Sequence, residues 1–156
     1  MVEKAHFEKV ISYLDSASAN GARLVHGGGV RRDVGSGWYV EPTIFDNVTP
    51  LMPIFREEVF GPILAVTTFQ TEEEAVKLAN DSDYGLAAFL YTRDLRRAHR
   101  VARKVRAGTV AVNGFSEGDL TVPFGGYKMS GFGGRDKGIE ALDQYTQTKT
   151  IWYVDE

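Results

Sequence analysis

The sequence predicts an α/β fold built around a parallel sheet. Three strand-like apolar runs, at residues 63–69, 87–92 and 109–113, are separated by helical segments that begin near Thr71 and Asp94. Strands that alternate with helices in this way form β-α-β units with right-handed crossovers. Ligands of such sheets bind beyond the carboxyl ends of the strands, so the residues that follow the last strand are expected at the functional edge.

The first segment of the chain is predicted to be an amphipathic helix. Phe7, Val10, Ile11 and Leu14 recur at i, i+3, i+4 and i+7, which places their side chains on one helical face. The Asn20-Gly21 pair is expected to end this helix, because both residue types accept the left-handed backbone of a helix C-terminus.

The segment after this helix is expected to form short antiparallel or edge strands. Residues 23–26 lead into three glycines at 27–29, which are interpreted as a turn because no helix start follows them. Residues 38–40 and 43–45 are two further strand candidates on either side of Pro42.

The two later helices carry their own start and stop signals. Thr71 and Glu74 form a capping-box pattern at the start of the first. The second helix begins at Asp94 and closes at Gly108. Its apolar face contains Leu95, Ala98, Ala102 and Val105.

Composition narrows the class of protein. The chain has 156 residues, 43% hydrophobic and 25% charged, which is typical of a folded globular domain. Its net charge of −3 gives nucleic acid and anionic membranes little attraction, and no apolar run is long enough to span a membrane. No nucleic-acid or membrane partner is therefore expected, and a cytoplasmic location is the default.

Two residue types limit the chemistry. There is no cysteine, which excludes a disulfide, a thiolate metal site and a cysteine nucleophile within this chain. The three histidines, His6, His26 and His99, stand far apart without ligand-like spacing, so no metal site is expected.

Two other patterns have structural interpretations that compete with functional ones. Arg96, Arg100 and Arg103 form a stripe that could contact phosphates, but a solvated outer helix face is favoured because no aromatic residues interleave with them. The glycine-rich residues 125–134 lead toward a possible helix from Asp136 and could cradle an anion. Close backbone packing is the favoured interpretation, because the Lys-Ser/Thr pair of a Walker loop is missing.

The segment 56–62 contains a candidate nucleoside site. Glu58 and Phe60 lie two residues apart before a strand and would share one face. A carboxylate can accept two hydrogen bonds from a vicinal diol, and an aromatic side chain can pack on a planar ring. On spacing alone, exposed acids before a strand are the favoured alternative.

The loop 113–124 contains a candidate substrate site at the expected functional edge. Phe115 and Phe124 supply aromatic walls, and Glu117 and Asp119 supply negative charge. This mixture suits a cationic or polar organic ligand. The alternative, in which the phenylalanines are core residues and the acids are solvated, stays open.

Several segments together resemble the C-terminal part of the aldehyde dehydrogenase superfamily, in the order in which the family has them. The resemblance runs from about His6 to Tyr153. The segments that carry it are Gly37-Trp38-Tyr39-Val40-Glu41-Pro42-Thr43-Ile44-Phe45, Arg56-Glu57-Glu58-Val59-Phe60-Gly61-Pro62, Asn80-Asp81-Ser82-Asp83-Tyr84-Gly85-Leu86-Ala87-Ala88, Ala107-Gly108-Thr109-Val110 and Pro123-Phe124-Gly125-Gly126-Tyr127-Lys128-Met129-Ser130-Gly131.

The resemblance implies oxidation of an aldehyde to an acid through a thiohemiacetal, with hydride transfer to NAD or NADP and hydrolysis of a thioester. It implies that Glu58 binds the nicotinamide ribose and that Phe60 packs near the nicotinamide. It also implies that the loop from Phe115 to Phe124, with Glu117 and Asp119, forms the aldehyde entrance, and that Phe124 is one of its walls.

The same resemblance predicts a fold made of part of a larger catalytic domain. Residues 1–130 match the C-terminal part of the aldehyde-binding domain, and residues 131–156 match a C-terminal helix and an oligomerisation arm. Residues 145–154 look like the family's strand that pairs with another subunit, which predicts a homo-oligomer and self-association.

This chain lacks several parts of the family's catalytic machinery, which predicts that the isolated chain is inactive. The family's cysteine nucleophile, oxyanion-hole asparagine, general-base glutamate and cofactor domain all lie upstream of the matching residues, so no catalytic residue is assigned and no cofactor is expected to stay bound. Residues 119–128 and 134–137 look similar to enzymes that act on amino-aldehydes, including γ-glutamyl-γ-aminobutyraldehyde dehydrogenases. The alternative is a non-enzymatic assembly or binding module of the same ancestry.

Overall fold

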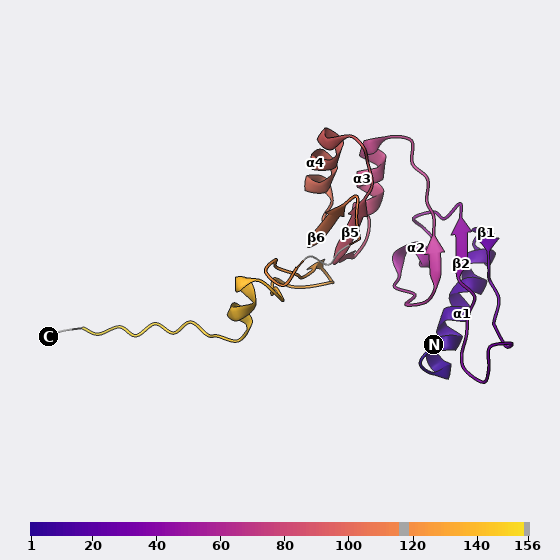
Figure 1. Ribbon diagram of the computed structural model, residues 1–156, viewed down its shortest axis with the longest axis horizontal. Helices are drawn as coiled ribbons and strands as arrows, with labels where there is room; N and C mark the ends of the chain where they lie inside the picture. Colours follow the sequence, from indigo (N-terminus) through magenta and orange to yellow (C-terminus); the bar gives the residue numbers. More distant parts are fainter. Residues whose placement is uncertain (116–118, 155–156) are drawn as a thin grey trace. The chain divides into compact units, whose positions relative to one another are not determined.

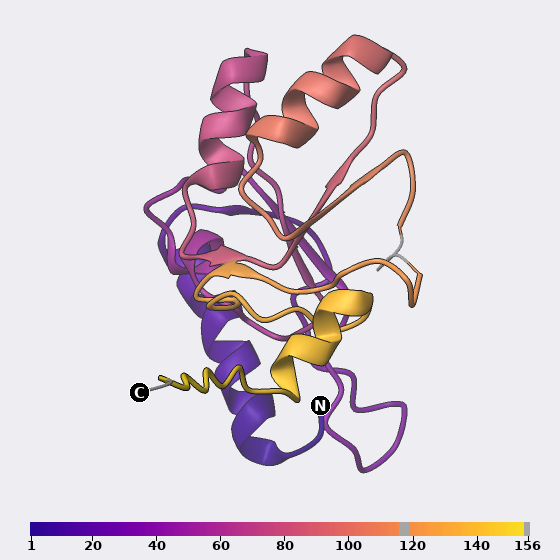
Figure 2. The same ribbon diagram turned by 90° about the vertical axis from the view of Figure 1, so that its left-hand side faces the viewer.

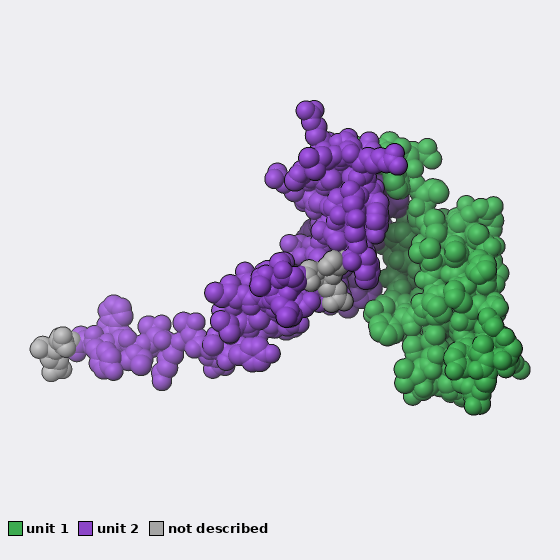
Figure 3. Space-filling view, viewed as in Figure 1, with its two compact units in different colours: residues 1–74 green, residues 75–156 purple. Residues whose placement is uncertain are grey.

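The computed structural model describes residues 1–115 and 119–154, in two compact units. Unit 1 comprises residues 1–74 and unit 2 comprises residues 75–156 (Figure 3). The division into residues 1–130 and 131–156 comes from the resemblance to a family, whereas the two units are defined by contacts within the chain. The family-based division stays a prediction.

Unit 1 is a helix packed on a three-stranded mixed sheet (Figure 1). The predicted first helix is confirmed as α1, Lys4–Ala19, which buries Val10, Leu14 and Ala17 and is followed by Gly21 at φ 91°. In the sheet, β1 (Arg23–His26) pairs antiparallel with β2 (Thr43–Asp46), and β2 pairs parallel with β3 (Ile63–Ala65). The buried core consists of Val10, Leu14, Ala17, Ala22, Val40, Phe45, Val48, Met52 and Ile54.

A cross-strand ion pair adds to the β1–β2 pairing. Arg23 lies opposite Asp46 in the register, and its guanidinium donates two hydrogen bonds to the carboxylate, one of them from Nε over 2.7 Å. These hydrogen bonds hold the pKa of Asp46 below its usual value. This ion pair favours the observed register at the first residue of β1.

The described residues of unit 2 form two small sheets, most of helix α3, helix α4 and a short 3-10 helix. Helix α3, Glu72–Asn80, begins at the boundary, and α4, Leu95–Lys104, connects β5 (Ala87–Leu90) to β6 (Thr109–Val112), which pair in parallel. The short strands β4 (Tyr84–Gly85) and β7 (Tyr127–Lys128) pair antiparallel. Of the predicted apolar face of α4, Ala98 is buried, whereas Leu95 is 72% exposed. The second buried residue of the helix is Val101, which the predicted face did not include.

The start signals of both helices are confirmed. The Asp94 carboxylate accepts a hydrogen bond from the backbone N–H of Arg97 over 3.1 Å. The Thr71 hydroxyl accepts from the N–H of Glu74 over 3.1 Å, and the Glu74 carboxylate in turn accepts from the N–H of Gln70 over 2.7 Å. The Asp94 and Thr71 side chains satisfy N–H groups that a first helical turn leaves unpaired, and Glu74 binds the N–H of a residue just before its helix.

The expected strands at 63–69, 87–92 and 109–113 occur in two sheets instead of one. The α/β class is confirmed, but β3 pairs with β2 in unit 1, whereas β5 and β6 pair with each other in unit 2. The first strand is also shorter than expected. After Ala65, the N–H of Val66 bonds to Phe45 O over 2.8 Å and Thr67 Oγ1 bonds to Val48 O over 2.8 Å, which directs the chain along the 45–48 segment.

Two further expectations were wrong in detail. Residues 38–40 do not form a strand; only Val40 makes a bridge, with Val30, while the Trp38 ring packs 5.2 Å from the Phe7 ring. The helix expected from Asp136 is a short 3-10 helix, η1 (Ile139–Gln144). Lys137 and Gly138 both have φ 63°, and consecutive left-handed residues prevent an α-helix from starting there.

The terminal residues 145–154 form neither helix nor strand, and they follow η1 at the gold end of the ribbon (Figure 2). Their large apolar side chains are exposed, and these are Tyr145, Ile151, Trp152, Tyr153 and Val154. The strand expected here requires the edge of another subunit, so intersubunit pairing stays a prediction.

Candidate functional site

The first candidate site lies between α2 (Pro53–Arg56) and β3, where the chain is extended and then turns sharply. Phe60 has φ 58°, which is uncommon for a residue with a bulky side chain. At the next position, a Cβ on Gly61 would come within 2.9 Å of Val10 Cγ1 of α1. Close packing against α1 therefore accompanies this turn.

Three polar residues of α1 hold the segment 57–60. His6 Nε2 lies 2.8 Å from Phe60 O, Lys9 Nζ donates to Glu58 O over 3.5 Å, and the Tyr13 hydroxyl donates to Glu57 Oε2 over 2.5 Å. Positions 6, 9 and 13 lie on one helical face. The segment is thus bonded to α1 at both ends and in the middle.

The side chains of Glu58 and Phe60 stay available to a ligand. Glu58 is exposed, and its carboxylate has no hydrogen-bond partner among residues 1–115 and 119–154. The Phe60 ring is 74% exposed and lies 6.1 Å from the His6 ring, at 49° to it. A free carboxylate beside a free aromatic ring fits a ribose diol and a planar base.

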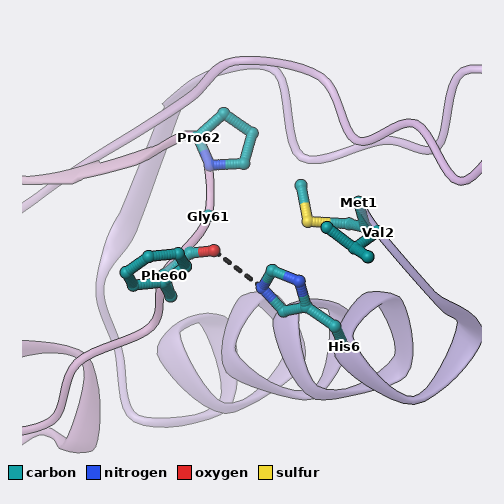
Figure 4. Close-up of a pocket in the computed structure, with 6 residues that line it drawn as sticks. All are labelled: Met1, Val2, His6, Phe60, Gly61 and Pro62. Carbon is teal, nitrogen blue, oxygen red and sulfur yellow. Dashed lines mark hydrogen bonds between the residues drawn. The ribbon is translucent and has the colours of Figure 1, made fainter.

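A shallow apolar hollow adjoins this ring (Figure 4). Its lining residues are Met1, Val2, His6, Phe60, Gly61 and Pro62. The hydrogen bond between His6 Nε2 and the Phe60 carbonyl lies among these residues, so α1 holds the backbone of Phe60.

The second candidate site lies in unit 2, around the loop after β6. Phe115 is 79% exposed and stacks on Phe89 of β5, with ring centroids 4.7 Å apart. Phe124 is half-buried. Phe115 is therefore not a core residue, which removes part of the structural alternative for this loop. Glu117 lies outside the described residues.

Asp119 is tied to its own turn. Its Oδ1 accepts hydrogen bonds from the Thr121 N–H over 2.6 Å and from the Thr121 hydroxyl over 2.5 Å. These hydrogen bonds favour the ionised carboxylate and lower the pKa of Asp119 below its usual value. Asp119 therefore supplies a fixed negative charge at neutral pH.

Replacing Thr121 with valine is expected to raise the pKa of Asp119 toward its usual value, because the hydroxyl donor is lost while the N–H donor stays. Since the folded-state pKa is the lower one, the stabilisation is present at neutral pH and is lost as the pH falls through it. A ¹³C NMR titration of the Asp119 carboxyl measures the shift. Thr148→Val, far along the chain, is the control; equal Asp119 pKa values in both variants would contradict this origin of the shift.

The Phe124 backbone is fixed by a bridge to the segment before η1. Phe124 N donates to Asp136 O over 2.6 Å, and Asp136 N donates to Phe124 O over 2.7 Å. Gly138 N donates to Leu120 O over 2.9 Å. Between these bonds, Lys137 places its Nζ 5.0 Å from the centre of the Phe124 ring.

The glycine-rich segment 125–134 is a packing element, as favoured from the sequence. A Cβ on Gly126 would come within 2.2 Å of Ser130 O, and the Ser130 hydroxyl accepts from Gly85 N over 3.1 Å. Lys128 Nζ donates to the carbonyls of Asn80 and Ser82, over 2.9 and 2.7 Å. These contacts fasten the segment to the end of α3.

A match to known proteins assigns the chain to a family. The model of the aldehyde dehydrogenase family matches residues 1–151. The chain belongs to the aldehyde dehydrogenase family. It is 55% identical over 152 residues to the aminoacetaldehyde dehydrogenase of Pseudomonas aeruginosa and 49% identical to the NADP/NAD-dependent aldehyde dehydrogenase PuuC of Escherichia coli. Each match covers 97% of this chain and 30% of the relative.

Solved aldehyde dehydrogenase structures agree with this assignment. An indole-3-acetaldehyde dehydrogenase in complex with NAD⁺ matches with a TM-score of 0.92 at 50% identity, covering 98% of this chain and 31% of that chain. The aldehyde dehydrogenase KauB from Pseudomonas aeruginosa matches with a TM-score of 0.91 at 48% identity, with the same coverage. The chain thus spans about a third of the length of these relatives.

The aldehyde dehydrogenase chain presents its predicted site residues in two groups. Glu58 and Phe60 lie together in unit 1, whereas Phe115, Asp119 and Phe124 lie in unit 2. Sequence reasoning missed their supports, which are His6, Lys9, Tyr13, Lys128 and Lys137. The polar 6, 9, 13 spacing beside the apolar stripe of α1 was a signal for the first three.

The arginine stripe noted in the sequence lies on one face of α4. Arg96, Arg100 and Arg103 lie on the exposed side of α4, opposite the buried Ala98 and Val101. Within residues 1–115 and 119–154 there is no cluster of three or more potential metal ligands of the His, Cys, Asp or Glu type. In the same part of the chain, no helix combines the length and apolarity that crossing a membrane requires.

Proposed function

We propose that this chain acts as the C-terminal part of an NAD(P)-dependent aldehyde dehydrogenase that oxidises a polar aldehyde of the amino-aldehyde type to a carboxylic acid. One observation in particular supports this role: the exposed pair of Glu58 and Phe60, which three residues of α1 hold by hydrogen bonds to the segment 57–60. The family and the names of the relatives support the reaction class.

The proposed task of unit 1 is to hold one half of the cofactor. The Glu58 carboxylate accepts the two ribose hydroxyl groups, and the Phe60 ring packs beside the nicotinamide. The bound nicotinamide supplies the hydride acceptor. Because His6 and Gly61 fix the backbone at Phe60, the ring position needs little reorganisation when the cofactor binds.

The proposed task of unit 2 is to shape the aldehyde entrance. Phe115 and Phe124 form apolar walls, and Asp119 with Glu117 favours a substrate whose cationic or polar group donates hydrogen bonds over a purely aliphatic one. The Asp119 carboxylate is ionised at neutral pH with or without Thr121, and the hydrogen bonds from Thr121 hold it in place.

The isolated chain is proposed to be inactive. It has no cysteine, so it cannot form the thiohemiacetal that precedes hydride transfer in this family. We also propose that it does not retain the cofactor, because one carboxylate and one ring make too few contacts. In the cell, the proposed location is the cytoplasm.

The deciding experiment compares residues 1–156 with the longer native polypeptide, or with a fusion to the upstream part of the Pseudomonas aeruginosa relative. The formation of NADH or NADPH from aminoacetaldehyde is followed at 340 nm. We expect turnover by the long polypeptide and none by residues 1–156. Turnover by the short chain would overturn the proposed inactivity, and no turnover of any aldehyde by the long native polypeptide would overturn the proposed function.

A second candidate function, an assembly module, is favoured by the exposed terminal residues 145–154. Isolated chains with these side chains free should self-associate through them. Sedimentation velocity is expected to show oligomers that dissociate when Ile151 and Trp152 are both replaced by serine. A monomer at every concentration would argue against both this module and the proposed homo-oligomer.

A further inference from the structure

A cationic side chain of the same chain lies over the Phe124 ring. Lys137 Nζ lies 5.0 Å from the centre of the Phe124 ring, within the range of a cation–π interaction. Its place is set by the backbone, because Asp136 is bridged to Phe124 on one side and Gly138 N bonds to Leu120 O on the other. The left-handed backbone of Lys137, at φ 63°, joins these two anchored residues.

An ammonium over this ring changes which ligands the ring can accept. Quaternary ammonium groups have no N–H to donate, so proteins recognise them mainly through the faces of aromatic rings. A second cation near the Phe124 ring would meet the charge of Lys137 at short range. Like charges brought together in a partly desolvated site oppose binding.

A primary ammonium group can bind in the same entrance through a different interaction. It donates hydrogen bonds, and Asp119 offers a carboxylate whose Oδ1 is bonded to Thr121. The other oxygen, Oδ2, has no partner in the described part of the chain. A charge-assisted hydrogen bond to this oxygen offsets the repulsion between a primary ammonium group and the nearby lysine. A trimethylammonium group cannot form this hydrogen bond.

We propose that Lys137 is a specificity-determining residue that makes the entrance reject quaternary ammonium aldehydes while it admits primary amino-aldehydes. The inference rests on the proposed function, because it takes Phe124 as a wall of the aldehyde entrance. It goes further by naming the head group that is excluded and the residue that excludes it.

The test uses two aldehydes of nearly equal shape that differ in charge. These are trimethylammonioacetaldehyde and its neutral isostere 3,3-dimethylbutanal. In the complete enzyme, the ratio of kcat/KM for the charged over the neutral aldehyde is expected to be well below one. In Lys137→Met this ratio should rise by about tenfold, the effect of removing one like charge at close range.

Matched variants separate charge from other effects. Lys137→Arg keeps the charge and should keep the low ratio. Arg135→Met removes a cation two residues away, one that lies over Tyr127 at 5.6 Å instead of over Phe124, and it should also leave the ratio low. Lys137→Gln serves as a second neutral variant if the methionine variant does not fold.

Each outcome decides between the proposals. A ratio near one in the wild-type enzyme, or an unchanged ratio in a folded, active neutral variant of Lys137, overturns this inference alone. An equal rise in Arg135→Met also overturns it, because the effect would then come from net charge. If the complete wild-type enzyme oxidises no aldehyde, the proposed function itself fails.

Discussion

Gly108→Ala is expected to destabilise unit 2 by at least about 3 kcal/mol, the upper end of what an overpacked core substitution costs. An added Cβ would lie 1.6 Å from Gly125 O and 2.8 Å from Gly125 C. Both contacts are with backbone atoms, so no side-chain rotation relieves them. The Gly108 N–H is also bonded to Gly85 O over 3.0 Å, which resists movement of this turn.

The free energy of unfolding can be measured by urea denaturation of the chain, with native-state hydrogen exchange to localise the effect to residues 75–154. Gly114→Ala is the matched control, because a Cβ at Gly114 would meet no atom of residues 1–115 or 119–154 within 4 Å. If both variants unfold at the same urea concentration, the close approach of residues 108 and 125 does not exist in solution.

In the complete enzyme, Glu58→Gln is expected to lower kcat/KM for the cofactor by about 10- to 100-fold. The substitution replaces a charged acceptor of two hydrogen bonds with a neutral one, and hydrogen bonds to charged groups contribute about 1.5–3 kcal/mol. If the ribose contact forms in the ground state, KM for the cofactor rises more than kcat falls. Steady-state kinetics with the cofactor as the varied substrate measure both.

Glu57→Gln is the matched control for Glu58. The two glutamates are neighbours, but the Glu57 carboxylate is bonded to the Tyr13 hydroxyl within the chain. Glu57→Gln should therefore affect cofactor kinetics less than Glu58→Gln does. A larger effect at Glu57, or none at Glu58, would contradict the assignment of the ribose contact to Glu58.

The local elements of the fold were largely predictable. Helix α1 followed from the spacing of Phe7, Val10, Ile11 and Leu14, and α4 followed from the cap at Asp94. These signals lie within one or two helical turns, where the contacts that stabilise a helix are made. The expected α-helix from Asp136 failed because the bridge to Phe124 and the backbone at residues 137 and 138 depend on distant residues.

The sequence supplied candidate site residues but not the residues that hold them in place. Residue type and family resemblance led to the set Glu58, Phe60, Phe115, Glu117, Asp119 and Phe124, whose roles stay predictions. Their anchors, His6 and Lys137, come from segments 54 and 13 residues away from Phe60 and Phe124. Neither anchor follows a local rule that connects it to its aromatic partner.

Residue order and type alone established the α/β class, the principal helices and the family of this chain, because periodicity, caps and motifs are properties of neighbouring residues. Only the folded chain showed that β3 pairs with β2 while β5 pairs with β6, and that Gly108 touches Gly125. Strand partners and close approaches depend on which segments compete for the same backbone hydrogen bonds and the same space. The competing segments are far apart in sequence, so tertiary packing determines the strand partners and the close approaches.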